Sequence, residues 1–338
     1  MASARVLICT TLQILLLASS AFLDSAAIGV NLGFSGNNLP PISRTVELIK
    51  SLPINIDRVK IFEANVDVIR AFAGSNLKML VSVTNDEISN IASSSQAAAN
   101  WVNDHIAPVA SSTNIEFVAV GNEVLSPSRN DLVPAMRNIR SALDASNFRN
   151  IKVTTPLALN FLADGSFPPS KGSFRGDYSS ILGSLLDFLS STDSPFMVNV
   201  YPYFSWKNDQ SIQLSYALFQ SRQTVVSDGQ YNYNNLLDAT VDTVYAAMEK
   251  SGHGNVKIAI GESGWPSSGG DGATTENAQA YLSGLINKIN SGNGTPRISG
   301  PLIANIFALY DENQKGGEEI ERHFGLLRPD GTPKYSLP

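Results

Sequence analysis

Cysteine is nearly absent from this chain of 338 residues. Its single cysteine, Cys9, lies in an apolar N-terminal segment, so the rest of the chain has no thiol for a disulfide or a metal site. Histidine is also scarce, with three residues and no H-x-x-x-H pattern. There are 24 Lys and Arg against 30 Asp and Glu, and no basic run stands out. We therefore expect no metal, no cofactor and no nucleic-acid partner.

The N-terminal segment has the features of a secretory leader. Arg5 precedes the apolar run Val6–Leu17, and the small residues Ser25-Ala26-Ala27 offer a cleavage site after Ala27. The run of about a dozen apolar residues is shorter than the roughly 20 that span a bilayer. We predict that residues 1–27 are a signal peptide, that residues 28–338 form one domain, and that the protein is not held in a membrane.

Short apolar segments alternate with segments of helical periodicity through the rest of the chain. Continuous apolar runs are typical of parallel strands that are covered on both faces. Gly33-Phe34-Ser35-Gly36, after the first run, is not a dinucleotide-binding G-x-G-x-x-G motif. Eight such units predict a closed (β/α)₈ barrel, the TIM-barrel fold, rather than an open sheet. The expected strands are Ile28–Leu32, Arg58–Phe62, Lys78–Val83, Ile115–Val120, Ile151–Thr155, Phe196–Val200, Val256–Ile260 and Leu302–Phe307.

One connection is much longer than the others. About thirty residues, Ser205–Asn235, follow the sixth expected strand, where 2 to 6 residues are usual. Beyond them, Leu237, Val241, Val244 and Met248 recur at helical spacing. We therefore predict an enlarged loop region at the catalytic end of the barrel.

Two glutamates occupy the positions where a barrel carries its chemistry. Glu123 follows the fourth expected strand and Glu262 follows the seventh, so both carboxylates should face the mouth. Such a pair suits cleavage of a glycosidic bond, which needs one acid and one nucleophile or base. A separation of about 5 to 5.5 Å gives retention of configuration and a wider one gives inversion. The sequence leaves that distance open, and fold-level analogy favours retention.

Neighbouring polar and aromatic residues are candidates for binding a sugar. Asn122, beside Glu123, can donate to a sugar 2-hydroxyl. Tyr201 and Tyr203 offer hydroxyls and ring faces, and Trp265 and Trp206 are candidates for stacking. The helical spacing around Trp101 instead predicts a core residue.

Several segments together resemble the plant-type β-1,3-glucanases of glycoside hydrolase family 17. They extend over nearly all of the chain that follows the leader, in the order found in the family. The matching segments are Gly29-Val30-Asn31, Val120–Val124, Asn199–Phe204, Gly261–Ser267, Asp311–Lys315 and Glu321–Leu326.

This resemblance implies retaining endo-hydrolysis of β-1,3-glucan, with Glu123 as acid/base and Glu262 as nucleophile. It adds Glu312, Lys315 and Glu321 as polar residues at the mouth. It implies a monomer that acts on a β-glucan polysaccharide and needs no cofactor.

The chain also departs from the family pattern at the mouth. Leu32 stands where members often have Tyr, and Phe62-Glu63 stands where they have Tyr-Asp. Both changes remove a phenolic hydroxyl, and we expect altered affinity with retained chemistry. Two alternatives stay open: a β-1,3-1,4-glucanase on the same fold, and a glucan-binding protein with weakened catalysis.

Two further features concern location and modification. The chain ends at Pro338 without an apolar tail, and its pI is near 5.1, which favours the extracellular wall space. The sequon Asn293-Gly294-Thr295 lies in a Gly- and Ser-rich stretch and predicts a surface loop that could carry an N-linked glycan.

Overall fold

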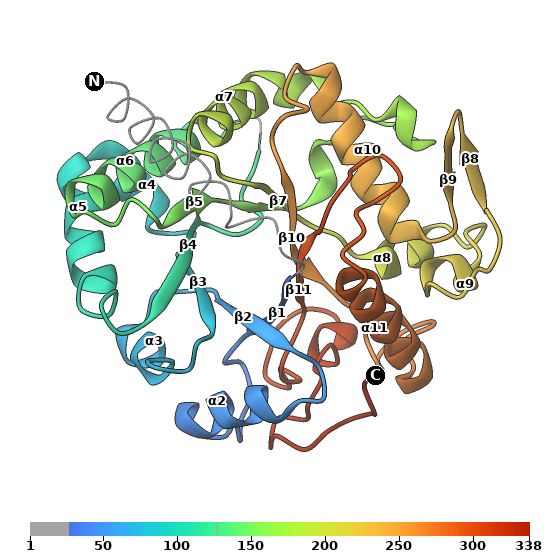
Figure 1. Ribbon diagram of the computed structural model, residues 1–338, viewed down its shortest axis with the longest axis horizontal. Coiled ribbons are helices and arrows are strands. Elements are labelled where there is room, and N and C mark those ends of the chain that lie inside the picture. Colours follow the sequence, from blue (N-terminus) through green and yellow to red (C-terminus); the bar gives the residue numbers. More distant parts are fainter. Residues whose placement is uncertain (1–26, 127) are drawn as a thin grey trace, which may run out of the picture.

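The computed structural model describes residues 27–126 and 128–338, and within them nine strands form one parallel sheet. The order is β5-β4-β3-β2-β1-β11-β10-β7-β6. Since only Thr155 separates β5 from β6, the two ends of this order are pieces of one strand, and the sheet closes into the predicted barrel (Figure 1). The strands are β1 Ala27–Leu32, β2 Ile56–Ile61, β3 Lys78–Val83, β4 Asn114–Val120, β5 Lys152–Thr154, β6 Pro156–Leu157, β7 Phe196–Asn199, β10 Ile258–Ser263 and β11 Ile303–Ile306.

Helices surround the barrel on the outside (Figure 1). The side chains of Asn65, Ser94, Asn235 and Thr274 cap the first turns of α3, α5, α10 and α11 by accepting backbone N–H groups. The apolar faces of the helices pack on the strands and form the main core, which includes Trp101 as predicted. The helices outside the enlarged connection are α2 Ile42–Ser51, α3 Val66–Ala71, α4 Ile88–Ser93, α5 Ser95–Trp101, α6 Leu132–Ala145, α7 Ser179–Ser191, α10 Leu236–Lys250 and α11 Thr275–Asn290.

The enlarged connection after β7 is present and is itself structured. It contains α8 (Pro202–Asn208), α9 (Leu214–Ala217) and an antiparallel hairpin of β8 (Val226–Asp228) with β9 (Tyr231–Tyr233). Asp228 of the hairpin accepts hydrogen bonds from the backbone and hydroxyl of Ser170. This contact joins the enlarged region to the loop that follows β6.

The inside of the barrel is partly charged, which the apolar strand pattern did not predict. Arg58 and Lys60 alternate along β2, and both side chains are fully buried. Arg58 forms an ion pair with Glu116 of β4 at 2.5 Å. A packed apolar layer also lies inside, formed by Leu80, Phe117, Ala119, Met197, Ala259 and Ile303. Lys60 lies two residues nearer than Arg58 to the end of the strand and is therefore close to the mouth.

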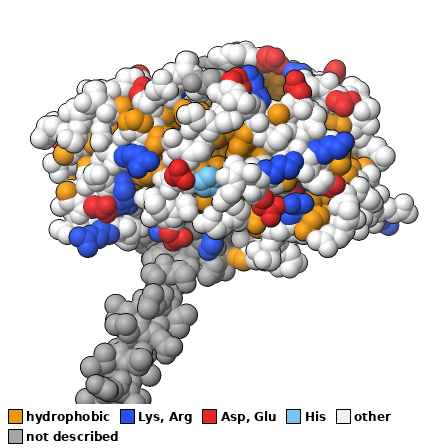
Figure 2. All heavy atoms as spheres, turned by 90° about the horizontal axis from the view of Figure 1, so that it is seen from above, with side chains coloured by type: hydrophobic (Ala, Val, Ile, Leu, Met, Phe, Trp, Pro, Cys, Tyr) orange, Lys and Arg blue, Asp and Glu red, His pale blue; other side chains and the backbone are white. Residues whose placement is uncertain are grey.

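The outer surface carries interspersed charges. On the flank drawn in Figure 2, basic and acidic side chains alternate without forming a continuous patch of one sign. Within the part of the chain that is described, no helix has the length and apolar character required to cross a bilayer. The predicted leader lies outside the described residues, except for Ala27, which opens β1.

Candidate active site

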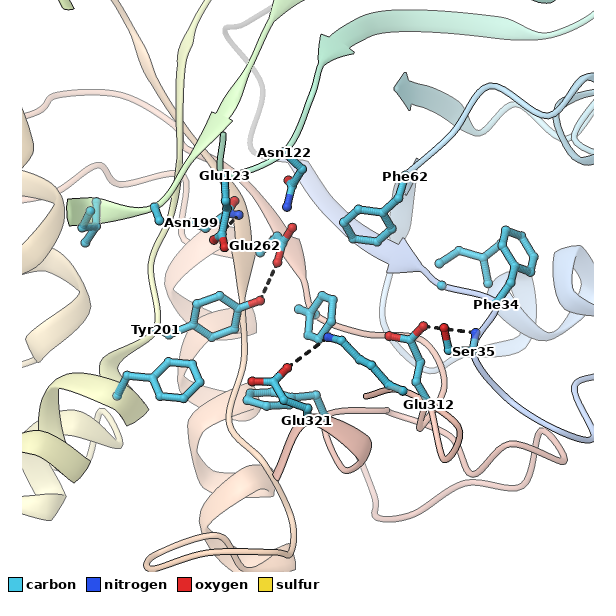
Figure 3. A pocket seen from close by; sticks show the side chains of 18 of the residues that line it. Phe34, Ser35, Phe62, Asn122, Glu123, Asn199, Tyr201, Glu262, Glu312 and Glu321 are labelled. Carbon is cyan, nitrogen blue, oxygen red and sulfur yellow. Dashed lines mark hydrogen bonds and ion pairs between the residues drawn. The ribbon is translucent and has the colours of Figure 1, made fainter. Parts of the chain in front are cut away.

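A cleft of about 750 Å³ opens where the strands end at the C-terminal face of the barrel. It brings together residues that are far apart in the sequence, and Figure 3 shows the Glu123 and Glu262 carboxylates pointing into the same part of it. The predicted site residues that line it are Asn122, Glu123, Tyr201, Glu262, Glu312, Lys315 and Glu321. Tyr203 and Trp265 are not among the cleft residues.

Glu262 is held by two hydrogen-bond donors. Its carboxylate accepts from Lys60 Nζ at 2.6 Å and from the Tyr201 hydroxyl at 2.7 Å. Burial lowers the pKa of Lys60, and the adjacent Glu262 opposes this effect. Burial and the negative charge of Glu262 raise the pKa of Tyr201 well above its usual value, so the phenol keeps its proton. Both contacts fix the positions of the Glu262 carboxylate oxygens.

Glu123 sits in a different setting. Gly121 and Glu123 both have a positive φ, of 71° and 57°. Glycine adopts this conformation readily, whereas for a glutamate it is uncommon and costs of order 1 kcal/mol or more. The Glu123 N–H donates to Pro156 O at 2.9 Å, and its carboxylate accepts from Asn199 Nδ2 at 2.8 Å. The residue faces the open cleft, but the cleft walls partly desolvate its carboxylate and raise its pKa. The nearby Glu262 raises this pKa further, while the Asn199 hydrogen bond and Lys60 lower it.

Asn122 is held by one backbone and one side-chain hydrogen bond. Its N–H donates to Asn85 Oδ1 at 2.8 Å, and its Oδ1 accepts from Lys60 Nζ at 2.9 Å. Because Oδ1 accepts from Lys60, Nδ2 is the group with which Asn122 can donate to a ligand.

Lys60 and Asn199 are site residues that the sequence analysis missed. Lys60 lies within a strand that was predicted from its apolar residues. The feature that could have identified it is the alternation of Arg58 and Lys60 with apolar residues along this strand. Asn199 belonged to a recognised motif but was assigned no role. Each contacts one of the two carboxylates directly.

A second group of polar residues lies on the loop after β11. Lys315 Nζ pairs with Glu321 at 3.0 Å and lies 4.6 Å from the centre of the Phe307 ring. Glu312 accepts from the Ser35 N–H at 3.3 Å, and burial raises its pKa. Gly33 packs directly against it: a Cβ there would lie 2.1 Å from Glu312 Oε1, so a larger residue would displace the Glu312 carboxylate. This packing holds the end of β1 against the loop.

Tyr203, Trp265 and Trp206 form a buried aromatic cluster behind the cleft. The rings of Tyr203 and Trp265 pack edge to face, 5.1 Å apart. Tyr203 donates to Asp271 O at 3.1 Å and Trp265 donates to Gly272 O at 2.8 Å, so both brace the loop after β10. The rings that line the cleft are instead Phe34, Phe62, Tyr201, Phe204, Phe307 and Phe324.

Comparison with known proteins confirms the resemblance to this family. The model of glycosyl hydrolases family 17 matches residues 28–338. A glucan endo-1,3-beta-glucosidase of Vitis vinifera is 42% identical, over 94% of this chain and 93% of its own. Lichenase-2 of Hordeum vulgare is also 42% identical, over 92% and 98%. The solved structure of CJP38, a beta-1,3-glucanase and allergen of Cryptomeria japonica pollen, has a TM-score of 0.88 and 48% identity, over 92% and 98%. The chain therefore belongs to glycosyl hydrolases family 17.

Proposed function

We propose that the protein is a retaining endo-hydrolase of β-1,3-glucan in which Glu262 is the nucleophile and Glu123 the acid/base. The observation that carries this proposal is the unequal setting of two carboxylates in one cleft. Glu262 accepts hydrogen bonds from Lys60 and Tyr201, whereas desolvation and Glu262 raise the pKa of Glu123. A double displacement needs this division, with one ionised and one protonated carboxyl group. The names of the relatives support the β-1,3 linkage.

The proposed reaction has two steps. Glu262 attacks the anomeric carbon while Glu123 protonates the departing glycosidic oxygen, which gives a glycosyl ester on Glu262. Glu123, now ionised, takes a proton from water, and the hydroxide portion attacks the anomeric carbon and releases Glu262. Lys60 and Tyr201 fix the attacking oxygens, and Asn122 Nδ2 binds the sugar 2-hydroxyl.

The remaining predicted residues have supporting roles in this proposal. The Lys315–Glu321 pair and Glu312 bind sugar hydroxyls along the cleft, and Tyr203 and Trp265 keep the loop that follows Glu262 in place. We also propose that the protein is a secreted monomer that acts outside the cell.

Product analysis on laminarin tests reaction and stereochemistry together. Under the proposal, NMR during early hydrolysis shows the β-anomer before mutarotation, together with oligosaccharide products. Initial release of the α-anomer would show inversion and contradict the double displacement. Binding of laminari-oligosaccharides without turnover from pH 4 to 7 would instead favour the glucan-binding alternative.

A mixed-linkage glucanase is the second candidate, because Lichenase-2 has the same 42% identity to this chain as the grapevine glucosidase. We expect faster hydrolysis of laminarin than of mixed-linkage β-1,3-1,4-glucan. The check is kcat/KM on both polymers with the same enzyme preparation. A preference for the mixed-linkage polymer would assign the second activity and leave the roles of Glu123 and Glu262 unchanged.

Asn199→Ala should move the alkaline limb of the pH profile to higher pH. A hydrogen bond to the ionised form lowers a pKa, so its loss raises the pKa of Glu123 and keeps the acid protonated at higher pH. We expect this upward shift in the profile of kcat/KM, which reports the free enzyme. Asn208→Ala is the matched control, because Asn208 lines the cleft while Asn199 contacts Glu123. An unmoved or lowered limb would contradict this assignment.

A further inference from the structure

The sequon Asn293-Gly294-Thr295 lies at the end of the barrel opposite the cleft. It belongs to the connection between α11 and β11, which enters β11 at its N-terminal end, whereas the cleft lies where the strands end. Asn293 is exposed, but Thr295 is 8% exposed. The acceptor asparagine is therefore accessible while the third residue of the motif is buried.

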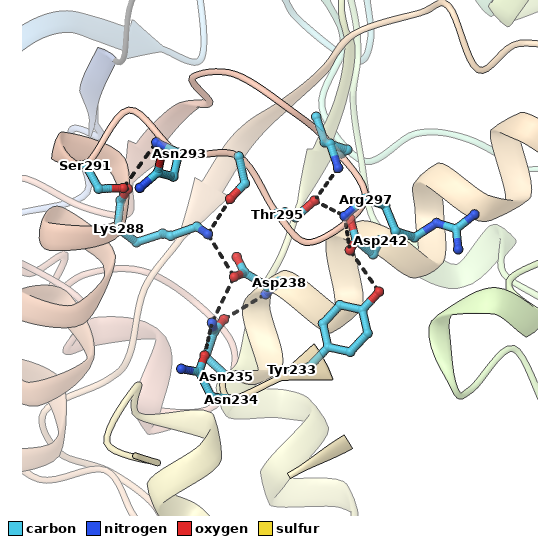
Figure 4. Close-up of polar contacts among 12 residues, drawn as sticks. Tyr233, Asn234, Asn235, Asp238, Asp242, Lys288, Ser291, Asn293, Thr295 and Arg297 are labelled. Carbon is cyan, nitrogen blue, oxygen red and sulfur yellow. Dashed lines mark hydrogen bonds and ion pairs between the residues drawn. The ribbon is translucent and has the colours of Figure 1, made fainter. Parts of the chain in front are cut away.

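The Thr295 hydroxyl is fully engaged in the folded protein. It donates to Asp242 Oδ1 and accepts from the Ile298 N–H at 3.1 Å (Figure 4). Asp242 is a completely buried residue of α10, and its other oxygen accepts from the Tyr233 hydroxyl at 2.9 Å and the Arg297 N–H at 3.0 Å. Removing Thr295 from this network would leave a buried carboxylate without one of its donors.

The backbone of the sequon is also held in place. Lys288 donates to Gly294 O and pairs with Asp238 of α10 at 2.8 Å. A Cβ at Gly294 would lie 1.8 Å from Ile298 O, so the loop closes tightly around this residue. The Asn293 N–H donates to Ser291 Oγ at 3.2 Å. A second protein could not bind this motif in another conformation without breaking these contacts.

We propose that Asn293 is an N-glycosylation site that is modified before this part of the chain folds and is closed by folding. The motif requires a hydroxyl at its third position, so the enzyme that transfers the glycan has to contact the Thr295 hydroxyl. In the folded protein this hydroxyl is hydrogen-bonded to Asp242. In the transfer, Asn293 Nδ2 bonds to C1 of a lipid-linked oligosaccharide and loses a proton. The bond from C1 to the diphosphate oxygen breaks, and the lipid diphosphate leaves. The proposal depends on secretion and is independent of glucan hydrolysis.

The first experiment asks whether the site is used. The full chain is secreted from cultured plant cells with its own leader, and intact mass is measured before and after peptide-N-glycosidase treatment. We expect a loss of mass equal to one N-glycan, with Asn293 converted to Asp. Asn293→Gln should show no such loss, and Thr295→Ser, which keeps a hydroxyl, should be modified. A wild-type protein without a glycan at Asn293 would overturn the proposal.

The second experiment asks when the site is used. Unmodified folded protein from bacteria and a synthetic peptide of residues 288–300 are each incubated with purified oligosaccharyltransferase and lipid-linked donor. We expect the peptide to be modified at least tenfold faster than the folded protein, as followed by mass spectrometry. Equal rates would overturn the claim that folding closes the site. Neither readout involves glucan, so a failure here is distinct from a failure of the proposed function.

Discussion

Replacing Glu262 by Gln should reduce laminarin hydrolysis by about 10⁴-fold or more, the range seen when a catalytic nucleophile is removed. The amide cannot attack the anomeric carbon, but it is close in size and can still accept from Tyr201 Oη. Initial rates of reducing-end release measure the loss, and the melting temperature shows whether the variant is folded. A folded variant with near wild-type rates would remove Glu262 from the mechanism.

Azide rescue then separates the two glutamates. In Glu262→Gly, azide can enter the space of the missing carboxylate and attack an aryl β-laminarioside directly, which gives an α-glycosyl azide. In Glu123→Ala, the glycosyl ester on Glu262 still forms from a substrate with a good leaving group, and azide then opens it to a β-glycosyl azide. The reverse pair of products would exchange the roles of Glu123 and Glu262.

The sequence predicted the barrel and the presence of two glutamates at its mouth for a common physical reason. Parallel strands covered by helices read as apolar runs, and polar residues directly after such runs have to emerge at the mouth. Glu123 and Glu262 satisfy this rule without knowledge of any side-chain packing. The rule fails within β2, because Lys60 lies inside a run and points into the barrel.

Adjacency in a motif did not predict which aromatic residues face the cleft. Tyr201 precedes α8 and points to Glu262, whereas Pro202 begins the helix and Tyr203, inside its first turn, is buried behind the cleft wall. The change from strand to helix reorients successive side chains. Periodicity alone could not place that boundary to within one residue.

Two glycines of the family motifs lie directly against asparagine side chains inside the barrel. A Cβ at Gly29 would lie 1.8 Å from Asn305 Oδ1, and one at Gly261 would lie 2.6 Å from Asn199 Oδ1. The amide oxygen of Asn199 thus packs against the residue before Glu262, while its Nδ2 donates to Glu123. The spacing of the two carboxylates therefore depends on Gly261 as well as on the strands that carry them.

Lys60→Met should have the second-largest effect, because it removes the cation that pairs with Glu262. Glu262 is 5% exposed, and Lys60 is the basic side chain that pairs with it. A buried charge that loses its partner is destabilised by about 3 to 5 kcal/mol, part of which the carboxylate avoids by binding a proton. A protonated Glu262 cannot attack, so we expect kcat to fall by about 10² to 10³-fold at neutral pH. The acid limb of the profile should move to higher pH.

Two control variants distinguish charge from packing. Lys60→Arg keeps the positive charge and should recover part of the activity, although its planar group fits the contacts to Asn122 and Glu262 differently. Lys207→Met removes an exposed ion pair with Glu318 and should leave kcat unchanged. If Lys60→Met loses thermal stability but keeps both kcat and its acid limb, Lys60 is a structural residue. A large fall in kcat with a raised acid limb shows instead that Lys60 keeps Glu262 ready for attack.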